Sequence, residues 1–136
     1  MLVEHARNVM GITDASHAES SADGTQVVIP LSCSLDGESI EITITAASLL
    51  ARLHSGARSV VELTTCNYGL DPARQQLASR GGMAISAIDG TGEVRAIERV
   101  DHPFFVGTLY QPQLRSTSAE PHPVWLGFVS ACRTGS

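Results

Sequence analysis

The sequence contains no lysine: its nine basic residues are all arginines, set against fourteen acidic residues, and the net charge is −5 over 136 residues. Without lysine there is neither Schiff-base catalysis nor the phosphate-binding lysine of a Walker nucleotide site. Phosphate backbones are bound by clustered positive charge, and here the arginines are scattered through an acidic chain. We therefore expect no nucleic-acid partner.

Aromatic residues are also scarce, at 4% of the chain, so the core must be built from Ala, Val, Ile and Leu. No apolar run approaches the roughly 20 residues of a membrane helix, and the best, at 124–129, is short. The first residues include Glu4, His5 and Arg7 and do not form a secretory signal. We expect a single domain over residues 1–136 and no membrane partner.

The three cysteines, Cys33, Cys66 and Cys132, are odd in number and widely spaced, with no C-x-x-C motif. This pattern excludes a zinc ribbon and a disulfide scaffold, and it predicts free thiols in a reducing cytoplasm. No His, Cys or carboxylate pair stands at helical metal-ligand spacing, and the closest pair is His17 with Glu19. We predict no metal site and no cofactor.

Hydrophobic periodicity and turn residues predict an α/β domain. The alternation of Ile40, Ile42 and Ile44 with polar residues indicates a half-buried strand, and Asp36-Gly37 before it is a hairpin signal. Loops are expected over 13–25 and 111–121. The expected helices cover 2–10, 46–53, 71–80 and 123–132, and the expected strands cover 26–31, 38–45, 58–64, 83–88, 93–99 and 104–110.

Cys66 is the best candidate nucleophile on residue type and position. It follows a predicted strand, and ligands bind at the carboxyl ends of strands in open α/β sheets. The alternative is a thiol that simply packs at the strand end. His102 and His122, which both precede proline, are either turn residues or candidate bases for this thiol.

Four separated segments, at 4–11, 61–68, 101–113 and 122–128, resemble in the right order the class I glutamine amidotransferase domains of the CTP synthase branch. The longest reads DHPFFVGTLYQPQ, where that branch has H-P-[FW]-F-V-x-x-Q-F-H-P-E. The resemblance runs from residue 2 to about 132. It implies a flavodoxin-like domain with a three-layer mixed sheet, and glutamine hydrolysis by a Cys–His–Glu triad.

The triad itself is altered. Gln111 and Gln113 stand at the positions of the family's His and Glu. A carboxamide cannot deprotonate a thiol, and it carries no charge to stabilise an imidazolium. The family's nucleophile precedes the helix that 4–11 resembles, so we expect it to be absent from this chain. The resemblance therefore implies a scaffold without the usual hydrolytic machinery.

A second altered segment is the one that contacts substrate in the family. Thr65, Cys66 and Asn67 replace its basic residues, while Tyr68 is retained. The resemblance thus implies that Cys66, Asn67 and Tyr68 bind a glutamine-like small molecule, together with Gln111 and Gln113.

A domain of this family has roughly 200 residues, so the resemblance also implies that its first strands are missing here. Three explanations remain open: a homo-oligomer or a complementing chain covers the exposed sheet, the fold has rearranged, or Met1 is an internal start. Four functions also remain open. They are a degenerate amidotransferase that binds a small molecule or a partner, a subunit or fragment of a working glutaminase or CTP synthase, a cysteine enzyme using Cys66, and a purely structural role.

Overall fold

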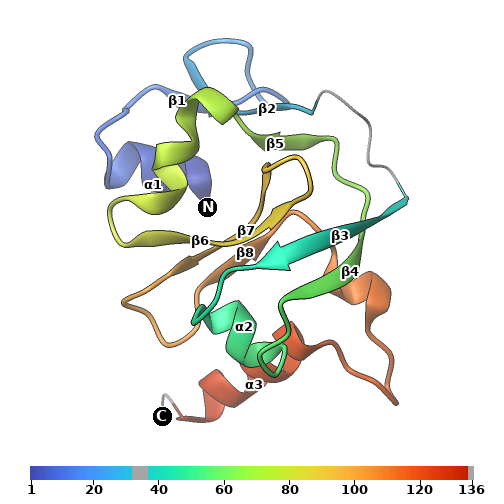
Figure 1. The fold of residues 1–136 in the computed structure, drawn as a ribbon. Coiled ribbons are helices and arrows are strands. Elements are labelled where there is room, and N and C mark those ends of the chain that lie inside the picture. The colour runs from blue at the N-terminus through green and yellow to red at the C-terminus, as the bar shows by residue number, and fades with distance from the viewer. Residues whose placement is uncertain (32–36, 135–136) are drawn as a thin grey trace.

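The computed structural model describes residues 1–31 and 37–134, which form two β-sheets flanked by helices (Figure 1). The larger sheet has the order β4-β3-β6-β7-β8, and its paired strands are all antiparallel. Its strands are β3 (Glu38–Ile44), β4 (Ser59–Thr64), β6 (Met83–Asp89), β7 (Val94–Arg99) and β8 (Val106–Thr108).

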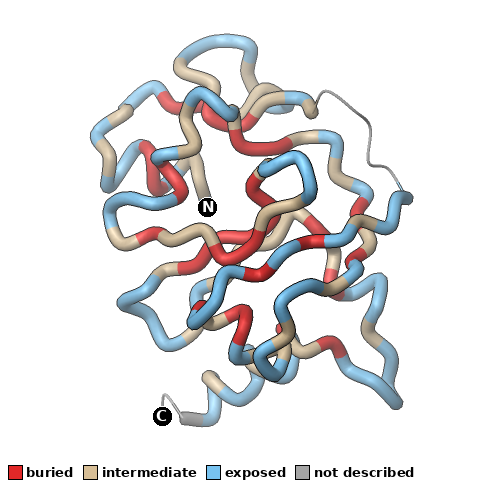
Figure 2. Tube along the Cα trace, viewed as in Figure 1, coloured by how far each residue is buried: buried red, intermediate tan, exposed pale blue. Residues whose placement is uncertain are grey.

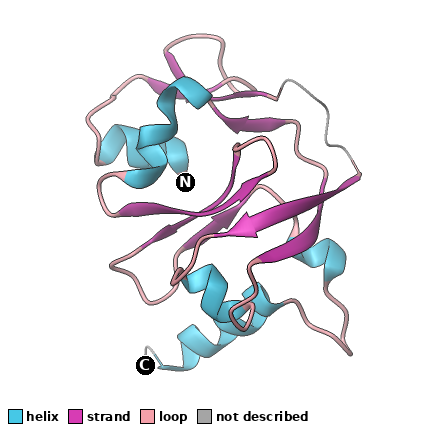
Figure 3. Ribbon diagram, viewed as in Figure 1, coloured by secondary structure: helices cyan, strands magenta, loops and turns pink. Residues whose placement is uncertain are grey.

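The smaller sheet has the order β1-β2-β5, with β1 parallel to β2 and β5 antiparallel to it. Its strands are β1 (Ala15–His17), β2 (Thr25–Pro30) and β5 (Tyr68–Leu70). The helices, which Figure 3 separates from the strands by colour, are α1 (Leu2–Asn8), α2 (Leu49–Leu53), α3 (Pro123–Thr134) and two 3₁₀ helices, η1 (Pro72–Ser79) and η2 (Pro112–Arg115).

Side-chain alternation along the strands gives the larger sheet an apolar surface on both faces. Neighbouring residues of β7 point to opposite sides, so Ala96 packs with α2 and α3 whereas Ile97 packs toward η1. On β3, Ile42 and Ile44 are 0% and 5% exposed and belong to the α2–α3 side. Figure 2 shows buried segments following these central strands.

The α2 helix is fixed to the sheet by hydrogen bonds to its first turn. The Ser48 hydroxyl accepts a hydrogen bond from the Ala51 amide at 2.9 Å. The carboxylate of Glu98, on β7, accepts from the amides of Leu49 and Leu50 at 2.8 and 3.2 Å. A buried acidic group here satisfies amides that have no partner within the helix and complements the positive end of its dipole.

The predicted strands and helices all have counterparts, but several differ in detail. Residues 13–25 are not a loop throughout, because Ala15 is buried and β1 pairs there with β2. Residues 71–80 form a 3₁₀ helix, with the Asp71 carboxylate accepting from the Ala73 amide at 3.0 Å. The 111–121 loop contains η2, and the strand expected over 104–110 is reduced to β8.

The hairpin signal at Asp36-Gly37 falls at the edge of the undescribed residues, and the described strands on either side of it, β2 and β3, belong to different sheets. Leu35, Asp36 and Cys33 lie outside the described residues. β5 was not expected, since three residues carry too little periodicity to indicate a strand. Among the described residues, none of the helices combines the length and the apolar character that crossing a membrane requires.

Candidate functional site

Gln111 joins two of the segments that carry the family resemblance. Its backbone N–H donates to the Leu63 carbonyl at 3.0 Å, and its side-chain Oε1 accepts from the Thr65 N–H at 2.7 Å. Its Nε2 donates to the Leu109 carbonyl at 3.3 Å. The residues after β8 are therefore fastened to the end of β4, and both polar ends of the Gln111 carboxamide have a backbone partner.

The Cys66 thiol has a backbone partner of its own. Its Sγ donates to the Tyr68 carbonyl at 3.3 Å, and the Cys66 N–H donates to the Thr64 hydroxyl at 3.2 Å. That hydroxyl in turn donates to the Leu109 carbonyl at 3.1 Å. These contacts hold Cys66, which is half-buried, within its own turn.

The two histidines considered as bases for Cys66 are engaged elsewhere. His102 is exposed, its Nδ1 accepts from the Phe104 N–H at 3.1 Å, and its ring lies 5.7 Å from that of Phe105. His122 is buried, and its Nε2 lies 3.0 Å from Oε1 of Glu62. The arrangement therefore lends no support to a Cys66–His nucleophile pair.

Asn67 and Tyr68 make contacts beside β2 and α1. The Asn67 carbonyl accepts from the Leu31 N–H at 2.8 Å, which begins the pairing of β2 with β5. The Tyr68 ring lies 5.1 Å from that of His17 and packs against the cluster beneath α1. The two residues have structural contacts in the smaller sheet.

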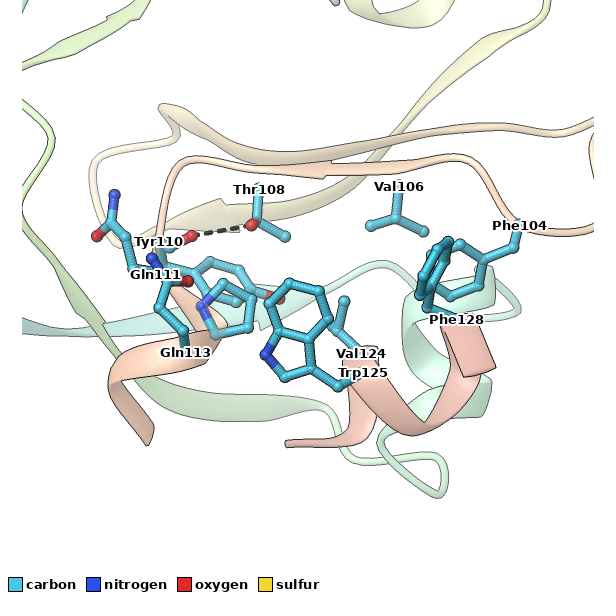
Figure 4. A pocket seen from close by; sticks show the side chains of 10 residues that line it. Phe104, Val106, Thr108, Tyr110, Gln111, Gln113, Val124, Trp125 and Phe128 are labelled. Atoms are coloured by element: carbon cyan, nitrogen blue, oxygen red, sulfur yellow. Dashed lines mark hydrogen bonds between the residues drawn. The ribbon is translucent and has the colours of Figure 1, made fainter. Parts of the chain in front are cut away.

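Gln111 and Gln113 line a cavity of about 380 Å³ between β8, η2 and α3 (Figure 4). The glutamines stand at one end, Trp125 lies along the wall, and the rings of Phe104 and Phe128, 5.7 Å apart, close the other end. The remaining lining residues are Val106, Thr108, Tyr110, Pro112 and Val124. Of the five predicted site residues, the cavity brings together the two glutamines and not Cys66, Asn67 or Tyr68.

Next to this cavity lies a polar cluster that the sequence did not reveal: half-buried His54 with buried Glu62 and His122, and the Tyr110 ring beside them. The His122 ring lies 5.5 Å from that of His54 and 6.2 Å from that of Tyr110. Glu62, His122 and Tyr110 are 3%, 5% and 1% exposed. No short spacing links the three, because they come from the end of α2, from β4 and from the residue before α3.

Burial governs the electrostatics of the cluster. It raises the pKa of the Tyr110 hydroxyl far above its ordinary value, and the nearby Glu62 charge adds to the rise. The pKa of His54 is lowered by burial and by repulsion from His122, against an opposing attraction from Glu62. His54 is therefore neutral, and Tyr110 is protonated, at pH 7.

Comparison with known proteins shows which family of folds this architecture is similar to. The chain is 34% identical to the CTP synthase of Methanospirillum hungatei over 96% of its length, and 28% identical to that of Methanopyrus kandleri. It superposes with a TM-score of 0.90, at 28% identity, on the glutaminase domain of Trypanosoma brucei CTP synthase solved with bound acivicin. The chain has the fold of a CTP synthase glutaminase domain.

This finding confirms the resemblance predicted from the four segments, and with it the fold. The match covers 98% of this chain and 56% of the Trypanosoma brucei chain. A Thermoplasma acidophilum protein described as a GMP synthase subunit shares the fold more distantly, with a TM-score of 0.58 at 12% identity. No family model matches the sequence. The chain spans about a quarter of the length of the curated CTP synthases that it matches, 26% in each of the two above.

Proposed function

We propose that this chain is a glutaminase-like domain of the CTP synthase type that binds a small, amide-bearing molecule without hydrolysing it by the Cys–His–Glu route. One observation carries the proposal. At the family's histidine position stands Gln111, whose carboxamide is held at both ends by backbone groups of Thr65 and Leu109.

The Gln111 carboxamide cannot act as a general base, for chemical reasons. An amide oxygen is far too weak a base to take a thiol proton near neutral pH, and Oε1 of Gln111 already accepts a hydrogen bond at 2.7 Å. Gln113, at the family's Glu position, is exposed and neutral, so it cannot stabilise a positive charge on a neighbouring base. The two substitutions remove the base and its carboxylate partner together.

The same cavity supports the binding half of the proposal. Its volume of about 380 Å³ is within the size range of small-molecule sites, which are mostly apolar with a few polar groups. Phe104, Trp125 and Phe128 supply the apolar wall, and the Gln113 carboxamide offers both a donor and an acceptor. These groups complement a molecule that has a short aliphatic part and an amide, as glutamine does.

The hydrolytic claim is tested by incubating the chain with glutamine and measuring glutamate and ammonia together. We expect release no faster than in a protein-free control. Sustained turnover of many equivalents per chain would overturn the proposal. If turnover occurs, a Cys66→Ser variant identifies its source, because loss of activity in that variant would make Cys66 the nucleophile.

The alternative is that the chain is one part of an active glutaminase that a second segment completes. The observation that favours it is the coverage: the chain matches 56% of the Trypanosoma brucei glutaminase chain. Large apolar side chains on the outer face of α3, among them Leu126 and Val129, would be available for that segment to cover. Ammonia released only when the uncovered part of that domain is added in trans would favour this alternative.

A further inference from the structure

The cluster of His54, Glu62 and His122 has the composition and geometry of a metal-binding site. Each residue offers one ligand atom, and the three atoms lie within 4.8 Å of one another. Nε2 of His122 and Oε1 of Glu62 are 3.0 Å apart, and the two imidazole rings meet edge to face at 79°. Short side-chain rotations would bring all three atoms to the ~2.0–2.2 Å ligand distances of zinc.

Three buried polar atoms of this region have no hydrogen-bond partner: Nε2 of His54, Oε2 of Glu62 and the Tyr110 hydroxyl. They are three of the five such atoms among the described residues, and the other two are serine hydroxyls elsewhere in the fold. Buried polar atoms are nearly always paired, so a carboxylate oxygen and an imidazole nitrogen left over beside each other indicate a missing occupant.

We propose that His54, Glu62 and His122 bind a divalent transition-metal ion, with two imidazole nitrogens and one carboxylate oxygen as its protein ligands. This donor set suits zinc and other first-row divalent ions, and it leaves at least one coordination position open. A cation would bind the unpartnered Nε2 of His54 directly, and its charge would compensate that of the buried Glu62 carboxylate.

The open position has access to solvent through a cavity of about 370 Å³ that all three ligands help to line. Two charged residues, Arg115 and Glu120, line the same cavity. The Arg115 guanidinium donates to the Val61 carbonyl at 2.6 Å, which holds its charge at the rim. Metal binding thus places a positive charge beside one buried carboxylate, with one further acid and one base at the entrance.

The proton on His122 must move when the metal binds. Nδ1 of His122 accepts the Val124 N–H at 3.2 Å, so the ring proton that faces Glu62 is on Nε2. When the metal takes the place of that proton between Nε2 and Oε1, the proton shifts to Nδ1. The Val124 N–H then loses its acceptor on Nδ1.

The direct test uses the full chain after dialysis against a chelator. We expect one equivalent of Zn²⁺ in calorimetry, an increase in the unfolding temperature with Zn²⁺, and visible Co²⁺ absorption typical of a four- or five-coordinate nitrogen–oxygen site. No saturable uptake at tens of micromolar Zn²⁺, together with no such Co²⁺ spectrum, would overturn the proposal and leave water as the occupant.

Matched variants locate the ion. His54→Phe should weaken Zn²⁺ binding at least 100-fold while leaving the metal-free fold intact, because it removes the unpartnered Nε2 and keeps an aromatic ring beside His122. Glu62→Gln should weaken Zn²⁺ binding similarly. If that variant does not fold, the Co²⁺ spectrum of the parent chain still tests whether nitrogen and oxygen ligands bind the ion. His102→Ala, at an exposed histidine, is the control and should bind normally. Equal binding by His54→Phe and the parent would contradict the assignment.

Discussion

Oε1 of Gln111 accepts the backbone N–H of Thr65 at 2.7 Å, and this contact ties the segment after β8 to the end of β4. The Gln111 side chain is thus part of the scaffold. Replacing Gln111 should therefore lower the free energy of unfolding more than replacing Gln113, which lines the same cavity.

Gln111→Ala should therefore lower the free energy of unfolding by about 1–2 kcal/mol, because it removes two side-chain hydrogen bonds that each contribute about 0.5–1.5 kcal/mol. The matched control is Gln113→Ala, an exposed site where the change should stay within about 0.5 kcal/mol. Chemical denaturation of both variants measures the difference. Equal effects of the two substitutions would mean that Gln111 has no special structural role.

Glu98 should be among the most sensitive polar residues of the fold. Its buried carboxylate accepts from two amides in the first turn of α2, so Glu98→Ala removes both bonds and leaves the buried Leu50 amide and the part-buried Leu49 amide without this partner. We expect a loss of about 2–3 kcal/mol. Thermal or urea unfolding checks this, with the exposed Glu41→Ala as control. A loss no larger than that of the control would contradict the capping role.

The stability of the β6–β7 hairpin should depend on acid pH through Asp89. Burial alone would raise the pKa of this carboxyl, but hydrogen bonds from Thr91 and Arg95 outweigh it and hold the pKa below its ordinary value. A lowered folded-state pKa stabilises the protein above the unfolded pKa of about 3.9, and this stability is lost as the pH falls through the folded value.

Asp89→Asn should accordingly lower stability at neutral pH and flatten the dependence of the unfolding free energy on pH below about 4. Unfolding curves between about pH 2.5 and 5.5 test this, with the exposed Asp23→Asn as the comparison. A steep acid transition of unchanged size in Asp89→Asn would show that other carboxyls dominate.

Cys66 should behave as an ordinary thiol. It is half-buried and donates to the Tyr68 carbonyl, whereas Cys132 is exposed near the end of α3. Iodoacetamide labelling followed by mass spectrometry should modify Cys132 first and Cys66 more slowly. Faster labelling of Cys66 would indicate an activated thiol and revive the cysteine-enzyme hypothesis.

The sequence predicted the parts of the fold in which local signals and tertiary packing agree. The Ile40–Ile44 alternation predicted β3, and Asp71 with Pro72 marked the beginning of η1. It did not predict β1 or β5, because a three-residue strand is defined by its partner strand rather than by its own pattern.

The candidate site was predictable in part. The family resemblance identified Gln111 and Gln113, and the structure places both on one cavity. The His54, Glu62 and His122 cluster could not be predicted, because its members are up to 68 positions apart in sequence and only strand and helix packing brings them together. The role of Cys66 stays a prediction, and the sequence gave no indication that its thiol donates a hydrogen bond to the Tyr68 carbonyl.

The most direct test of the proposed function is a glutamine titration that follows ligand binding and ammonia in the same sample. Trp125, the single tryptophan, lines the cavity and reports binding through its fluorescence. The account predicts a saturable fluorescence change with no ammonia above the protein-free control. Steady ammonia release, or fluorescence that does not respond to glutamine, would contradict it.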